Sequence, residues 1–278
     1  MPGVTGACCE PTLRWYHGCG PVEEGMNVST EGRFPAASAW QLEFARLIAF
    51  PTEPPLFLDQ HWWQDLASRQ PEDFVSTRKK HTHEDRGSFQ GVVLTLRVDL
   101  SRVEWLIQPP VEFEESPGNF PTIGPFQEKV DWFVELLSPW MANSCPPLVR
   151  LAFAGKLLQA AATQQEAYRV LGAHLPAVNL DPNPNDFLFQ VNRRRISTVV
   201  PGLPLNRISA WSKLNVALSI ESPARTPFRW SDKCYSAVEL DMNTAPDRAE
   251  VLPRESLPQL FRELASLGVE IAERGDIP

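Results

Sequence analysis

The residues best suited to metal chemistry are the histidines of the run His81-Thr82-His83-Glu84-Asp85. On an extended segment, side chains two positions apart point to the same side, so His81 and His83 could bind one metal ion. Binuclear metallo-hydrolases continue this pattern as His-x-His-x-Asp-His, but position 86 is arginine and only His174 follows. The cations of residues 78–80 also oppose metal binding. We therefore expect a charged, solvated loop without a metal, with metal or acid–base chemistry at His81 and His83 as the alternative.

A second group, Arg193-Arg194-Arg195 with Arg207, has the chemistry of an anion site. Forked guanidinium donors bind phosphate or carboxylate. Nearby rings would add a stacking surface for single-stranded nucleic acid, namely Phe187, Phe189 and Trp211. On a strand, Arg193 and Arg195 share one face and Arg194 takes the other. Arg193, Arg195 and Arg207 are thus candidates for anion or partner binding; the alternatives are sheet-edge protection and cross-strand ion pairs.

Glu239 and Asp241 form the third group, because alternate acidic residues on one strand face could hold Mg²⁺ or serve as general acid and base. Two carboxylates are a weakly specific pattern, and ion pairs with Arg193 and Arg195 on a neighbouring strand explain them equally well. If these four side chains line one concave pocket, an enzyme is favoured. If they neutralise one another on an open surface, an interaction protein is favoured.

The adjacent pair Trp62-Trp63 is the best indication of a protein-binding surface. Neighbouring residues on a helix diverge by about 100°, so one helix stripe cannot bury both rings. One ring is therefore expected to be exposed, to lie between domains or to contact a partner. Tryptophan is enriched at binding hot spots, which makes Trp62 and Trp63 candidate partner contacts.

The motifs of several enzyme classes are missing. The sequence contains no GxxxxGK[ST] phosphate loop, no GxGxxG after a strand, no GxSxG nucleophile elbow and no HExxH zinc motif. No cysteine lies in a nucleophile signature, and no cofactor is indicated. The net charge is −8, from 26 Lys+Arg against 34 Asp+Glu, which makes a nucleic-acid partner less expected because such proteins usually carry a basic footprint.

The expected location is the cytoplasm, without a membrane partner. The longest apolar stretches, such as Leu148–Leu158, contain charges and fall short of the ~18–20 residues of a membrane helix. The first residues lack the basic and apolar regions of a secretory signal. The 5 cysteines are therefore expected to be reduced.

Residues 1–35 are expected to form a flexible extension, with Met26 as an alternative start. This segment contains Cys8, Cys9, Cys19 and His17, whose spacing is poor for zinc because adjacent cysteines rarely share one tetrahedral ion. Recognisable patterning begins near residue 36.

Apolar periodicity and proline boundaries predict the elements that position these groups. The expected strands cover 41–50, 92–100, 103–108, 148–158, 186–197, 214–220 and 236–242, and the expected helices cover 59–68, 125–143, 163–175 and 254–273. Asp59 is a candidate N-cap, and Thr163 with Glu166 a capping box. Ser101-Arg102 would link a hairpin, and Gly155 would mark a bulge or turn.

This order predicts an α+β fold, a mostly antiparallel sheet with helices packed on one face. Each half, 36–145 and 146–278, runs strand, helix, two or more strands, helix. Two hypotheses explain the similarity: internal duplication, or one continuous domain in which it is accidental.

The sequence favours a cytoplasmic, non-catalytic interaction or accessory protein whose partner is another protein. The missing catalytic motifs, the acidic charge and the 9 tryptophans support this interpretation. The alternatives are an enzyme acting on a phosphate-containing substrate, and a single-stranded nucleic-acid binder that uses the Arg193–Arg195 strand. The sequence does not determine the oligomeric state.

Overall fold

The computed structural model describes residues 39–55, 61–77, 79, 81–110, 120–181, 186–220, 228–246 and 250–277. The expectations for residues 1–35 and for Asp59 as an N-cap lie outside these residues. The strands are β1 (Gln41–Pro51), β2 (Asp73–Thr77), β3 (Thr82–Phe89), β4 (Val92–Val98), β5 (Val103–Gln108), β6 (Leu148–Ala161), β7 (Leu188–Asn192), β8 (Arg195–Ile196), β9 (Pro204–Ile220) and β10 (Phe228–Thr244). The helices are α1 (Trp62–Ala67), α2 (Phe126–Asn143), α3 (Gln164–His174) and α4 (Leu257–Arg274), with a 3-10 turn, η3 (Arg254–Ser256), before α4.

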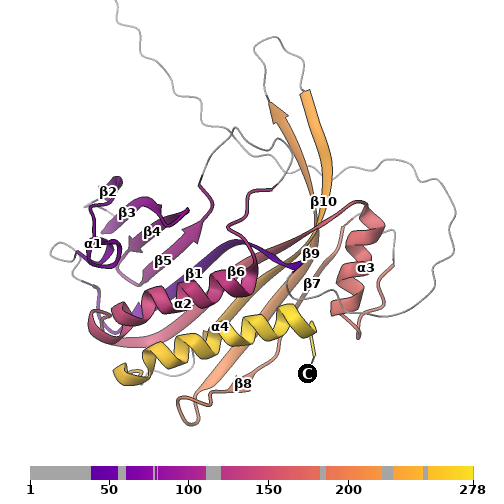
Figure 1. Cartoon of the computed structure of the whole chain (residues 1–278). Helices are drawn as coiled ribbons and strands as arrows, with labels where there is room; N and C mark the ends of the chain where they lie inside the picture. Colours follow the sequence, from indigo (N-terminus) through magenta and orange to yellow (C-terminus); the bar gives the residue numbers. More distant parts are fainter. Residues whose placement is uncertain are drawn as a thin grey trace, which may run out of the picture.

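All these strands form one antiparallel sheet, in the order β2-β3-β4-β5-β1-β6-β10-β9-β7 with β8 also paired to β9. In Figure 1, α2 and α4 lie side by side across one face of this sheet. The predicted α+β fold is therefore confirmed. Within the described residues, no helix has the length and apolar character needed to cross a membrane.

The two expected halves share this sheet, because β1 and β6 pair at its centre. The first half contains β1, α1, β2 to β5 and α2, and the second contains β6, α3, β7 to β10 and α4. The last strand of each half flanks the central pair, with β5 beside β1 and β10 beside β6. Internal duplication and a division near residue 145 stay predictions.

Side-chain alternation along the strands decides what enters the core. On β1, Ala45, Leu47 and Ala49 are fully buried on the side that the helices cover, while the residues between them are partly exposed on the opposite side. We call this opposite side the helix-free face. In the core, His174 packs between Trp40 and Trp211. Burial lowers the pKa of His174, so its imidazole is held in the neutral form.

The predicted hairpin and the predicted helix cap are confirmed, but the hairpin link is wrong in position. The link between β4 and β5 covers residues 99–102 rather than Ser101-Arg102 alone, and Asp99 Oδ1 accepts hydrogen bonds from the backbone N–H groups of Ser101 and Arg102. Thr163 Oγ1 accepts from the Glu166 N–H at 3.2 Å and so caps α3. In both cases a short polar side chain accepts hydrogen bonds from backbone N–H groups two or three residues further along the chain.

Two other local predictions are wrong. Most of the expected loop around residues 81–85 is the start of β3, which pairs with β2 and β4. The sequence of β3 is polar and lacks the apolar alternation by which a strand is predicted. Pairing with β2 and β4 on either side holds this segment in the sheet. Gly155 pairs regularly with Ala45, and the two irregularities of this strand pair lie elsewhere, between Leu42 and Phe44 and between Phe50 and Pro51.

The chain turns sharply at Gly275, just after α4. Gly275 has a positive φ of 74°, and its N–H donates to the carbonyl of Ile271 at 2.8 Å. The next N–H, that of Asp276, donates to the carbonyl of His174 at 2.8 Å. These bonds draw the C-terminal segment so close to α3 that a Cβ at position 275 would collide with the His174 carbonyl oxygen.

We predict that Gly275→Ala lowers the free energy of unfolding by about 2 kcal/mol or more, since it adds a backbone collision to left-handed strain. Gly202→Ala is the matched control: its φ is 73°, but the space around its Cβ position is open, so strain alone should cost about 1 kcal/mol. Urea unfolding of both variants measures the difference. Equal losses would contradict the close approach of the C-terminal segment to α3.

Candidate functional site

The histidines expected to act together lie in different local environments. His81 is exposed in the turn before β3, with a positive φ of 50°. His83 lies within β3, with Nε2 at 3.0 Å from Asp85 Oδ1. Within the described ranges, no group of three or more His, Cys, Asp or Glu side chains is placed to hold a metal ion. The structure therefore joins His83 to Asp85 rather than to His81.

Arg193 and Arg195 contact the C-terminal end of the chain. Arg193 makes a two-pronged ion pair with Asp276, with Nε–Oδ1 and Nη2–Oδ2 distances of 2.9 Å each. The Asp276 side chain is only 4% exposed, so Arg193 compensates a nearly buried charge. Arg195 is more exposed and lies 3.7 Å from Glu270 of α4.

Arg207 is the third arginine of this group, and its side chain is buried. Its Nη1 donates to the backbone carbonyl of Ile277 at 3.1 Å, and its Nη2 lies 3.6 Å from Glu270. Burial lowers the pKa of Arg207, against the opposing effect of Glu270. The three arginines thus meet acceptors of the chain's own C-terminal segment.

The predicted alternation of the arginines is confirmed, because Arg194 points the other way and its Nε donates to Asn206 Oδ1 at 3.1 Å. The predicted pairing of Arg193 and Arg195 with Glu239 and Asp241 is wrong. The two acidic residues belong to the helix-free face of β10, one residue out of phase with the side chains that face the helices.

Trp62 and Trp63 are both buried, at 5% and 1% exposed, so the expectation that one ring contacts solvent or a partner is wrong. Trp63 donates its Nε1–H to the carbonyl of Leu94 on the sheet at 3.2 Å. Trp62 packs edge-on against Trp140 of α2, with ring centroids 5.6 Å apart. The helix α1 lies between the sheet and α2, so two of its sides are buried. The prediction assumed that only one side of the helix would be buried.

A hollow of about 430 Å³ lies on the helix-free face at the centre of the sheet. Its floor contains Ala152 and Ala154 of β6, whose small side chains lie between two rows of larger ones. One side is β1, with Phe44, Arg46, Ile48 and Phe50. The other side begins with Glu239 and Asp241 of β10 and continues over Ile208 and Ala210 of β9 to Gln190 of β7. We call this hollow the β6 furrow. It contains the two acidic candidates and none of the three arginines predicted to join them.

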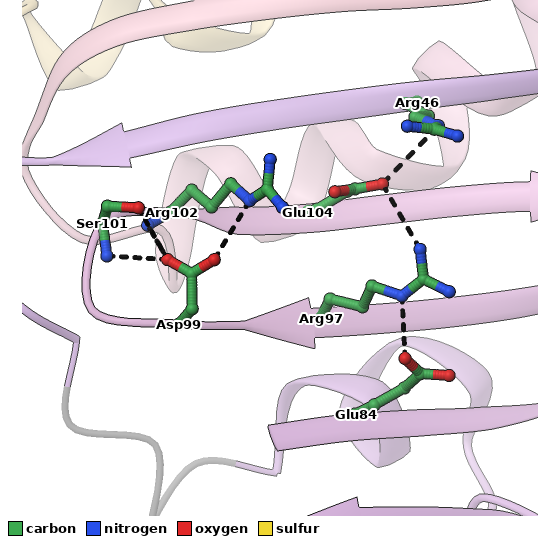
Figure 2. Close-up of polar contacts among 7 residues, drawn as sticks. All are labelled: Arg46, Glu84, Arg97, Asp99, Ser101, Arg102 and Glu104. Carbon is green, nitrogen blue, oxygen red and sulfur yellow. Dashed lines mark hydrogen bonds and ion pairs between the residues drawn. The ribbon is translucent and has the colours of Figure 1, made fainter. Parts of the chain in front are cut away.

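A ladder of alternating charges leads across the sheet to the β1 side (Figure 2). Glu84, Arg97, Glu104 and Arg46 contact one another in this order, with N–O distances of 2.8, 3.9 and 3.6 Å. The Glu104 side chain is only 3% exposed, and the two arginines on either side compensate its charge. The Arg46 guanidinium also lies over the Phe44 ring, 4.6 Å from its centroid. These contacts hold Arg46 in position at the furrow.

Side-chain amides hold the β10 side from the other direction. Asp241 Oδ1 accepts from Asn243 Nδ2 at 2.7 Å, and Asn243 Oδ1 accepts from Asn206 Nδ2 at 3.0 Å. Asn206 Oδ1 in turn accepts from Asn192 Nδ2 at 3.0 Å. The polar contacts from both directions end at the alanines of β6, so the furrow separates two ordered polar rows.

Ala152 and Ala154 of β6 lie between two basic residues of the same strand, Arg150 and Lys156. Lys156 Nζ lies 2.9 Å from Glu43 Oε2, and burial raises the pKa of Glu43 against the effect of Lys156. Arg150 lies over the Phe50 ring at 4.9 Å. Its Nε is buried and has no hydrogen-bond partner in the part of the chain that the structure describes. Among the described residues Arg46 and Lys156 have acidic partners whereas Arg150 has no ion pair, so Arg150 is the cation of the furrow best placed to take an anion from outside.

Sequence reasoning missed Arg46, Arg150 and the alanine floor. A signal existed in the alternation Arg150-x-Ala152-x-Ala154-x-Lys156, whose intervening residues Leu151 and Phe153 are large and apolar. Alternate residues of a strand lie on the same face, so considering every second residue of this strand would have identified the row. The sequence around Arg46 contained no signal of its role, because its partner Glu104 lies on β5, far away in the sequence.

We predict that Arg193→Ala lowers the free energy of unfolding by about 3 kcal/mol, because it leaves the nearly buried Asp276 carboxylate without a counter-charge. Arg195→Ala is the matched control and should cost less than about 1 kcal/mol, since its ion pair is longer and solvated. Chemical unfolding at neutral pH compares the two variants. A loss for Arg193→Ala no greater than that for Arg195→Ala would rule out a structural role for the Arg193–Asp276 pair.

Comparisons with known proteins identify no similar protein. No protein-family model matches the chain, and no curated protein or solved structure matches it. The function must therefore be argued from the chemistry of the β6 furrow.

Proposed function

We propose that this chain is a cytoplasmic, non-catalytic interaction protein that binds an extended segment of a partner protein in the β6 furrow. The observation that carries the proposal is the alanine floor between a largely apolar β1 side that contains Arg46 and an acidic β10 side with Glu239 and Asp241. The small alanine side chains of the floor let another backbone approach the sheet closely. The two sides of the furrow offer hydrogen-bond donors and acceptors to the C=O and N–H groups of that backbone. Within the described ranges the buried thiol of Cys145 forms no disulfide, which fits a reducing compartment.

An extended segment fits the dimensions of the furrow. From Arg150 to Gly155, the first and last of the β6 residues that line the furrow, the strand rises about 17 Å, so a partner segment of about six or seven residues would span it. Every second side chain of that segment would point to the floor, where Ala152, Ala154 and the neighbouring Ile48 favour apolar groups. Its backbone groups would point sideways, C=O groups toward Arg46 and N–H groups toward Asp241.

The charges at the furrow favour a segment with opposite charges at its ends. Arg150 offers a guanidinium to a carboxylate, which it binds through two parallel hydrogen bonds. Toward the other end, Glu239 is exposed and favours a lysine or arginine side chain. The preferred ligand therefore has an acidic end, a basic end and apolar residues at alternate positions between them.

Binding is favoured over catalysis by the residues at the furrow. No serine, cysteine or histidine is among the described residues that line it, so it lacks the usual nucleophiles. The phosphate-substrate and nucleic-acid alternatives depended on Arg193, Arg195 and Arg207, which contact Asp276 and Glu270 instead.

The probe is a fluorescent heptapeptide with lysine at one end, glutamate at the other, and valine alternating with threonine between them. We expect saturable binding in fluorescence anisotropy. Ala154→Phe fills the floor and should weaken binding at least tenfold, which is about 1.4 kcal/mol. Arg150→Gln should weaken it similarly by removing the carboxylate partner.

Arg262→Gln is the matched control, because Arg262 is an exposed arginine of α4 paired with Glu135 away from the furrow. It should leave the affinity unchanged, and a peptide of the same composition with contiguous valines should bind more weakly. Equal affinity for the two peptides, or no effect of Ala154→Phe in a folded variant, would refute the furrow as a peptide site.

A further inference from the structure

The free edge of β2 exposes apolar surface on both of its faces. β2 stands at the end of the sheet and, among the described strands, pairs only with β3. Its Phe74 and Val75 are 72% and 62% exposed, and neighbouring residues of a strand point to opposite faces. Sheet edges in monomeric proteins usually carry charges or proline that discourage pairing. Two adjacent exposed apolar residues therefore suit an edge that is covered by another strand.

We infer that a second copy of this chain adds its own β2 to this edge in antiparallel order, which makes one continuous sheet across a two-fold axis. Charge complementarity identifies the second copy as the occupant. Asp73 begins β2 and Lys79 follows its end; both are exposed, and neither has an ion pair among the described residues. Pairing centred on Val75, the middle residue of β2, sets Val75 of the two copies opposite each other and Asp73 of each copy opposite Thr77 of the other, two positions before Lys79.

The opposite edge of the sheet is less suited to this pairing. It also exposes apolar residues, Leu188 at 73% and Ile196 at 62%. However, the arginines beside it are already engaged, Arg193 with Asp276 and Arg194 with Asn206. They are not available to pair with acidic groups of a second copy.

Strand pairing over the five residues of β2 buries little surface, at the low end of specific interfaces. The dimer is therefore expected to dissociate on dilution. Its formation does not use the β6 furrow, which lies at the centre of the sheet.

Analytical ultracentrifugation of the full chain, from low micromolar concentration upward, tests the inference. We expect the average mass to rise from one chain toward two. Val75→Lys should weaken dimerisation at least tenfold by placing two like charges at the centre of the new strand pair. Leu188→Lys makes the same kind of change at the opposite edge and should leave the dimer intact.

A charge exchange tests the antiparallel register. Asp73→Lys and Lys79→Asp should each weaken the dimer, and the two changes together should restore it. A single-chain mass at every concentration would overturn the inference, as would a dimer that resists Val75→Lys or that Leu188→Lys breaks. Failure of the double variant to recover would overturn the proposed register.

Discussion

The antiparallel pairing of β1 with β6 is the constraint on which the other features depend. This pairing runs from Gln41 with Leu158 to Pro51 with Leu148, and every other strand is added outward from it. Because side chains alternate, the same pair must satisfy two environments. On one face Leu47 and Phe153 meet the helices, and on the other Ala152 and Ala154 leave a hollow. The core and the candidate site are therefore two sides of one strand pair.

Elements with strong local signals could be predicted from the sequence. The apolar periodicity of α2 and α4, the β4–β5 hairpin and the Thr163 cap all depend on residues close together in the chain. The lengths of β9 and β10 could not be predicted. Their extensions contain buried polar residues such as Asn206 and Asn243, which bond each other across 37 positions. Burial of such groups requires partners that no local window contains.

The candidate site was predictable only in part. Glu239 and Asp241 were identified because two carboxylates on one strand face are visible in a short window. Their surroundings depend on registers between distant strands, which set Asp241 beside Ala154 and Arg46 beside Glu104. Trp62 and Trp63 failed as surface candidates for the same reason. Their burial depends on a layer formed by α2, and the helix sequence itself contains no sign of that layer.

The arginines at the C-terminal segment have a consequence for the order of folding. Arg193 and its partner Asp276 lie 83 positions apart in the sequence, and Arg207 donates to Ile277 of the same late segment. A chain emerging from the ribosome presents its earlier segments first. Until residues 270–277 have emerged, the buried position of Arg207 would hold a positive charge without its counter-charges. The buried charge at the β8–β9 end of the sheet therefore depends on groups that are synthesised after both strands.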